Sequence, residues 1–211
     1  MATVKPFKAI RPTQDKTPFV VSRSYQSYTK KELNANLQFN PFSFLHIINP
    51  GYKFDKQVTG TKRFSLVRNR YLEFLEEDIL IKDEVPSFYL YQIEQDNVIC
   101  CGLFCATSVA DYRNNVIKKH EDTIKRRETL FANYLNTVKF NAEPVLMTYS
   151  DTEELKTLLK SEKSKDPTHH FTTTDKVTHT LWVISDTTIT KNIQHQFASV
   201  EKLYIADGHH R

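Results

Sequence analysis

The sequence predicts an α+β fold, or mixed α/β, in which helices flank a mixed sheet that contains an antiparallel hairpin. Apolar residues recur at helical spacing over residues 62–79. Two β-rich runs, residues 87–94 and 98–107, are separated by three polar residues, a pattern that predicts a hairpin. Between residues 140 and 206 the patterns of strand and helix alternate.

The first quarter of the chain predicts short elements. Prolines interrupt residues 5–24, so we expect an irregular and then extended segment there. Thr29-Lys30-Lys31-Glu32 fits a capping box and predicts a short helix that ends at Asn40-Pro41. The apolar run over residues 43–48 predicts a strand, after which the amphipathic helix over 62–79 follows.

The rest of the chain predicts helices and strands in turn. After the hairpin we expect a helix over 123–138, a strand over 144–149, a helix capped at 150–153, a loop over 161–176, a strand over 177–185, a helix over 189–197 and a final strand over 203–206. A chain of 211 residues can bury a sizeable core. We expect either a single domain, with a subdivision near residue 140 as an alternative, or the N-terminal part of a longer protein.

Composition excludes several functional classes. The net charge of +4 is mild and its charges are interspersed, so nucleic acid is not expected as a partner. The four glycines lie far apart, which excludes a Walker A loop and a dinucleotide fingerprint. No apolar run approaches the roughly 20 residues of a membrane span, and the N-terminus has no signal core. We therefore expect a cytoplasmic protein with no membrane partner, whose oligomeric state the sequence does not predict.

Three cysteines, Cys100, Cys101 and Cys105, lie within one predicted strand. An odd, clustered count is not a disulfide framework. Strand alternation puts Cys101 and Cys105 on one face and Cys100 on the other, which argues against a shared metal ion. We expect buried structural thiols.

The last five residues, Asp207-Gly208-His209-His210-Arg211, are the strongest candidate site because they leave the end of an apolar strand. Gly208 can turn tightly and let backbone N–H groups approach a ligand. Arg211 can pair with a phosphate or carboxylate, and His209 or His210 can donate to the same anion or shuttle a proton. Asp207 can orient an imidazole, hold Mg²⁺ or act as a base.

Asp207 to Arg211 are the last residues of the chain, which leads to a further expectation. A helix that followed it would turn its first amides toward an anion. The chain stops at Arg211, where that helix would begin. We therefore expect an incomplete site and weak activity in these 211 residues alone.

A second candidate is His120-Glu121, just before the helix predicted from Thr123. A carboxylate beside a histidine can serve as a base. The alternative is a solvated, charged helix start, where acids are favoured by the helix dipole. The pair matters chemically only if the fold brings it to Asp207.

Taken in order, several stretches resemble the N-terminal half of the family called domain of unknown function 1015, over residues 5–211. The matching stretches are Pro6-Phe7-Lys8-Ala9-Ile10-Arg11-Pro12, Asn40-Pro41-Phe42-Ser43-Phe44-Leu45-His46, Ile117-Lys118-Lys119-His120-Glu121-Asp122-Thr123, Glu143-Pro144-Val145-Leu146, His179-Thr180-Leu181-Trp182 and Tyr204-Ile205-Ala206-Asp207-Gly208-His209-His210-Arg211. The resemblance implies a whole protein roughly twice as long.

A more distant likeness implies a mechanism. Gly208-His209-His210-Arg211 is similar to the phosphate-binding turns of sulfiredoxin and ParB-type proteins, a superfamily that includes a nucleotide-dependent free-serine kinase. By that likeness Gly208, His210 and Arg211 would hold the phosphate of ATP or ADP, with Mg²⁺. Glu121 or Asp207 would be the base or the Mg²⁺ ligand.

Three functions follow from these features. The leading one is a kinase-like phosphotransferase, or a nucleotidase, acting on a small polar metabolite. The second is a metal-dependent hydrolase that uses Asp207, His210, His120 and Glu121. The third is a non-catalytic regulatory or DNA-binding module of the ParB type, which the modest charge disfavours.

Overall fold

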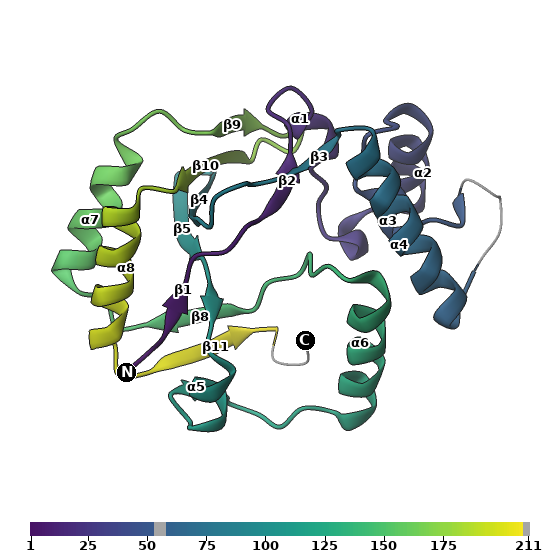
Figure 1. The fold of residues 1–211 in the computed structure, drawn as a ribbon. Helices are drawn as coiled ribbons and strands as arrows, with labels where there is room; N and C mark the ends of the chain where they lie inside the picture. The colour runs from purple at the N-terminus through teal and green to yellow at the C-terminus, as the bar shows by residue number, and fades with distance from the viewer. Residues whose placement is uncertain (53–57, 209–211) are drawn as a thin grey trace. The chain divides into compact units, whose positions relative to one another are not determined.

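The structure is a computed structural model that describes residues 1–52 and 58–208. The chain divides into two compact units. The first unit consists of Met1–Ala9, Asp83–Glu128 and Ala142–Arg211, and the second of Ile10–Lys82 and Thr129–Asn141. Each unit is built around its own apolar core, and the mixture of helices and strands confirms the predicted α+β class (Figure 1).

An antiparallel four-stranded sheet forms the larger part of the first unit. Its order is β5-β4-β10-β9, with β4 at Phe88–Gln95, β5 at Val98–Phe104, β9 at His169–Thr172 and β10 at Thr178–Ile184. Asp96 and Asn97, both with positive φ, join β4 to β5. Two such residues make a turn whose twist matches that of the strands, so the predicted hairpin is confirmed.

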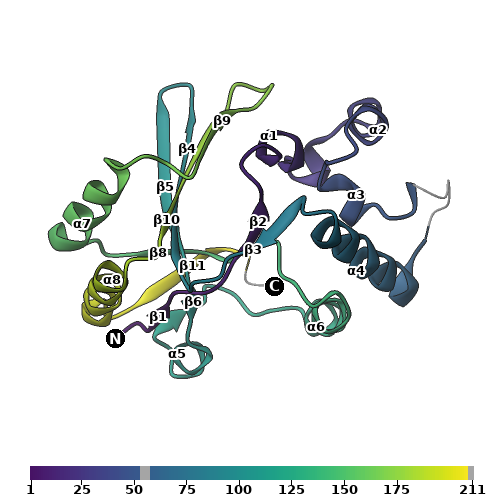
Figure 2. The same ribbon diagram turned by 45° about the horizontal axis from the view of Figure 1, so that its top comes forward.

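Two helices cover one face of this sheet, α7 at Glu153–Lys163 and α8 at Thr187–Ser199 (Figure 2). The Thr152 side chain caps α7 by accepting from the Leu155 amide, and Asp186 caps α8. The helices and the sheet share a buried core whose principal members are Phe88, Leu90, Trp182, Ile184, Leu155, Ile193 and Phe197. The spacing of the leucines and isoleucines in the sequence predicts these two buried faces.

A second, three-stranded sheet of the same unit has the order β7-β11-β8. Its strands are β7 at Ile117–Lys118, β8 at Leu146–Tyr149 and β11 at Leu203–Asp207. The short helix α5, Val109–Arg113, leads into β7, and β1, Val4–Lys5, pairs with β6, Ala106–Thr107. The amide of Thr3 donates to the buried carboxylate of Asp111 at 2.6 Å, which ties the N-terminus to this unit.

The second unit is mainly helical. Its elements are α1 at Thr17–Val20, a 3-10 turn at Tyr25–Ser27, α2 at Lys30–Phe39, α3 at Leu45–Ile48, α4 at Gly60–Glu76 and a two-stranded sheet of β2, Ile10–Pro12, with β3, Leu80–Lys82. The part of α6, Lys125–Val138, from Thr129 onward also belongs to it. Phe64, Val67, Tyr71 and Phe74 form the buried face of α4, and the Arg68 guanidinium donates to the Val138 carbonyl at 3.0 Å.

Three sequence predictions of secondary structure are wrong. The segment over 5–24 contains the short helix α1, because Pro18 lies in the first turn, where its missing N–H breaks no helical hydrogen bond. Within residues 43–48, Leu45–Ile48 form helix α3 rather than a strand, because the Ser43 hydroxyl and carbonyl accept from the amides of Leu45 and His46 and start a helical turn. A short apolar run does not distinguish the two structures by periodicity. The predicted loop over 161–176 contains the end of α7 and strand β9, because His169–Thr172 pairs with β10.

The prediction of buried thiols is also wrong for Cys100 and Cys101. Cys100 and Cys101 are exposed, and Cys105 is half-buried. All three are free thiols. Strand β5 lies at the edge of its sheet, and among the described residues no strand pairs with its outer side, which leaves Cys100 and Cys101 less covered than residues of a central strand.

No helix in residues 1–52 or 58–208 is both long and apolar enough to cross a membrane.

Cys105 provides a test of the packing in the first unit. Burial raises the pKa of its thiol from 9.0 to about 11, so below pH 9 the folded chain holds about 100-fold less thiolate at this position than an unfolded chain. Because the thiolate is the nucleophile, we expect iodoacetamide to modify Cys105 about 100-fold more slowly in the folded protein than in urea. Mass spectrometry of the labelled peptides measures both rates, and equal rates would contradict the packing.

The same shift predicts a pH dependence of stability. Since the folded thiol has the higher pKa, protonated Cys105 stabilises the fold below pH 9.0. This contribution is lost as the pH rises through the interval up to about 11. A Cys105→Ala variant, whose own packing defect is independent of pH, is the control.

Candidate functional site

The candidate site begins at the carboxyl end of β11, the central strand of the three-stranded sheet (Figure 1). Leu203 and Ile205 point into the core, whereas Asp207 at the end of the strand is exposed. Gly208 follows with a φ of 88°, in the left-handed region. A side chain at this position would strain the backbone, so a glycine is needed for the chain to turn here.

The neighbouring strand β7 brings the second candidate to the same place. It runs parallel to β11, with Ile117 opposite Leu203 and Lys118 opposite Tyr204. Because parallel strands end at the same edge of a sheet, the residues after β7 lie beside the end of β11. The ring Nδ1 of His120 is 3.0 Å from the Ile205 carbonyl oxygen. The fold thus brings His120 to the strand that ends in Asp207.

This contact fixes the chemistry of the His120 ring. A carbonyl oxygen only accepts, so Nδ1 carries the hydrogen and donates it. In the neutral ring the lone pair is therefore on Nε2. Functional histidines are commonly oriented in this way by a backbone carbonyl on the other nitrogen.

The other neighbour of β11 adds an irregularity next to Asp207. Strand β8 is antiparallel to β11, with Met147 opposite Ile205 and Leu146 opposite Asp207, so that Ala206 is an extra residue in the ladder. Such a bulge changes the direction of the side chains that follow it and is frequent beside active sites. It lies directly before the candidate acid.

Glu143 is a residue that reasoning from the sequence did not place in the site. Because β8 begins with Leu146 opposite Asp207, the chain enters β8 at the edge where β11 ends, and Glu143 precedes this entry by three residues. Only the pairing of β8 with β11 reveals its position.

The predicted site residues are therefore partly assembled. His120, Glu121, Asp207 and Gly208 follow or end the two parallel strands. The predicted roles of His209, His210 and Arg211 fall on residues outside those that the structure describes. Among the described residues, no three His, Cys, Asp or Glu side chains form a metal-binding group.

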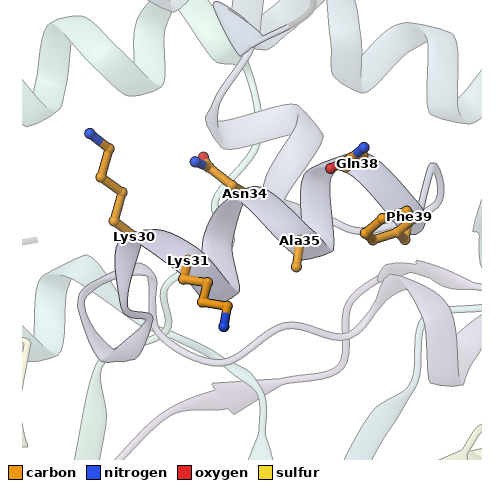
Figure 3. A pocket seen from close by; sticks show the side chains of 6 residues that line it. All are labelled: Lys30, Lys31, Asn34, Ala35, Gln38 and Phe39. Atoms are coloured by element: carbon orange, nitrogen blue, oxygen red, sulfur yellow. The ribbon is translucent and has the colours of Figure 1, made fainter.

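A hollow in the described surface lies away from this edge of the sheet. It is on the second unit and is lined by six residues of one helix, α2 (Figure 3): Lys30, Lys31, Asn34, Ala35, Gln38 and Phe39. Ligand sites are normally concave and enclosed by several elements. A hollow walled by a single helix does not enclose a small molecule, so it does not compete with the strand ends as a site.

Comparison with known families supports the resemblance seen in the sequence. The family described as "Protein of unknown function (DUF1015)" matches residues 4–211 of this chain. The chain belongs to the DUF1015 family. The DUF1015 match includes β7, β8, β11 and the residues that follow β11. No curated protein and no solved structure matches the chain. The likeness to ParB and sulfiredoxin stays a prediction.

Proposed function

We propose that the edge of the sheet where β7 and β11 end binds the phosphate groups of a nucleotide. The DUF1015 protein would then be a nucleotide-dependent phosphotransferase, or a nucleotidase, acting on a small polar metabolite. The observation that carries this proposal is the hydrogen bond from His120 to the Ile205 carbonyl, which brings a histidine to the strand that ends in Asp207-Gly208. Sheets with parallel strands bind ligands at the carboxyl ends of those strands.

The proposed phosphate-binding segment is Gly208 to Arg211. The positive φ of Gly208 supports a tight turn in which backbone N–H groups approach an anion. The guanidinium of Arg211 would present two parallel N–H groups to phosphate oxygens, and His210 would donate one more. The similarity of this segment to the phosphate-binding turns of sulfiredoxin and ParB-type proteins supports the same assignment.

His120, Glu121 and Asp207 would perform the proton transfer and hold Mg²⁺. In a transfer from ATP, the hydroxyl of the acceptor attacks the terminal phosphorus, its proton passes to a base, and ADP leaves. His120, or one of the two carboxylates, would be the base that accepts this proton. A carboxylate, Glu121 or Asp207, would bind the Mg²⁺ that accompanies the nucleotide. The sequence predicts a cytoplasmic protein, and the cytoplasm contains both the nucleotide and Mg²⁺.

A thermal-shift screen against ATP, ADP, AMP and GTP, with and without Mg²⁺, tests the proposal. A ligand that binds only the folded state, at about 100 times its Kd, is expected to raise the Tm by about 5–10 °C. Metal analysis of the purified protein accompanies the screen. No shift with any nucleotide, together with one bound transition metal per chain, would contradict the phosphotransferase and favour a metal-dependent hydrolase.

A further inference from the structure

The three-stranded sheet that carries the candidate site has an outer face that the fold leaves exposed. On its inner face, Leu203 and Ile205 of β11 are buried in the core of the first unit. Because side chains alternate along a strand, Tyr204 between them points to the opposite face, where it is 48% exposed. An exposed aromatic ring therefore lies on the central strand, three residues before Asp207.

The strands on both sides of β11 complete this outer face. Lys118 of β7 and Thr148 of β8 lie opposite Tyr204 in the two ladders, so their side chains share its face. Leu146 lies two residues before Thr148, on the same face and opposite Asp207, and is 59% exposed (Figure 1). The outer face around Tyr204 thus combines an aromatic ring, an aliphatic side chain, an ammonium group and a hydroxyl.

The side chains along β11 become smaller toward the proposed phosphate-binding segment. Tyr204 is followed by Ala206, which is exposed and has only a methyl group, and then by Gly208, which has no side chain. The three residues from Tyr204 to Asp207 span about 10 Å of strand. This length is comparable with the separation of base and phosphates in an extended nucleotide. A ligand whose phosphates lie at Gly208 can therefore follow β11 over Ala206 and reach the Tyr204 ring.

We propose that the base of the nucleotide stacks on the Tyr204 ring, with the ribose over Ala206 and the phosphates at Gly208–Arg211. This inference rests on the proposed function and adds the subsite for the base. Bases stack on tyrosine rings in many proteins, because every base has a flat π face. The ammonium group of Lys118, beside the ring, would donate to an oxygen of the ribose or of the α-phosphate.

The composition of the outer face favours a nucleotide over a segment of protein as the occupant. Of the described residues in β7, β8 and β11, Leu146 and Tyr204 are the large apolar ones that are exposed. The centre of a protein interface is depleted of charged residues, whereas Lys118 lies directly beside Tyr204. Sites for small molecules combine an apolar surface with a few polar groups, as this face does. The positive charge of Lys118 also complements the phosphates of a nucleotide.

Calorimetry with ATP and with inorganic tripolyphosphate, both with Mg²⁺, separates the base from the phosphates. Tyr204→Ala is expected to raise the Kd of ATP about 5- to 150-fold, the usual effect of removing one base-stacking ring, and to leave the Kd of tripolyphosphate unchanged. Tyr204→Phe keeps the ring and should bind ATP like the wild type. The matched control is Tyr25→Ala, at a tyrosine of the second unit that is 47% exposed, and it should change neither Kd.

The outcomes of this comparison distinguish the base subsite from the proposed function. A Tyr204→Ala chain that binds ATP like the wild type would overturn the base subsite and leave the phosphate site in place. Equal weakening of ATP and tripolyphosphate would also overturn it, because Tyr204 would then act on the phosphates or on the fold. A wild-type chain that binds neither ligand would contradict the proposed function, and the base subsite with it.

Nuclear Overhauser effects between bound ATP and the protein test the stack directly. In the wild-type chain the two ring protons of adenine are expected to show cross-peaks to the ring protons of Tyr204. A cross-peak to the methyl groups of Leu146, which lies on the same face toward Asp207, would support the same position. Adenine cross-peaks confined to aromatic rings elsewhere in the chain would overturn the proposal.

Discussion

Replacing Arg211 by alanine is expected to weaken the binding of ATP with Mg²⁺ by about 10- to 100-fold, because a hydrogen bond to a charged phosphate contributes about 1.5–3 kcal/mol. The backbone amides of the turn would supply the remaining contacts. Isothermal titration calorimetry of the wild-type chain and the variant measures the two Kd values.

Two further variants separate the geometry of Arg211 from its charge. Arg211→Lys keeps the charge but loses the planar fork, so its Kd should fall between those of the wild type and Arg211→Ala. Arg113→Ala removes an exposed arginine from the end of α5 and should bind ATP like the wild type. If Arg211→Ala binds ATP as the wild type does, Arg211 does not hold the phosphate.

Replacing Phe74 by alanine is expected to lower the free energy of unfolding of the second unit by about 3–5 kcal/mol. Phe74 is fully buried, at 0% exposure, on the inner face of α4, where it belongs to the core cluster that includes Val67 and Ile79. The Arg70 guanidinium lies over its ring, 4.8 Å from the centroid. Truncation therefore leaves a cavity and also removes a cation–π contact.

Phe39 provides the matched control for Phe74. It is the last residue of α2 and is 77% exposed, so Phe39→Ala should change the free energy of unfolding by no more than about 0.5 kcal/mol. Hydrogen exchange of the α4 amides under native conditions measures both variants within the second unit itself. A Phe74→Ala chain whose α4 amides stay as protected as in the wild type would contradict the packing of this core.

Much of the fold could be predicted because the elements have strong local signals. The apolar face of α4 recurs at helical spacing from Phe64 to Phe74, about three turns, and the Thr29–Glu32 capping box is formed as the sequence predicts. The errors occur where tertiary context decides. The apolar run at Leu45–Ile48 is compatible with strand or helix, and the exposure of Cys100 and Cys101 depends on β5 being an edge.

One part of the candidate site could likewise be predicted from the sequence, and another part could not. The end of a buried strand at Asp207 and the need for a turn at Gly208 are visible in the sequence, and the structure has both. The meeting of His120 with Ile205 was not predictable, because it joins residues 85 positions apart through a strand, β7, of only two residues. A two-residue strand has no periodicity, so only its pairing with β11 identifies it.

An NMR titration of the ¹⁵N-labelled chain with ATP and Mg²⁺ tests most directly whether the nucleotide binds at the ends of β7 and β11. The amides of His120, Glu121 and Gly208 are expected to shift as ATP is added, while those of α2, which lines the hollow of the second unit, stay in place. Shifts confined to α2, or no shifts at saturating ATP, would contradict the proposed site at the ends of β7 and β11.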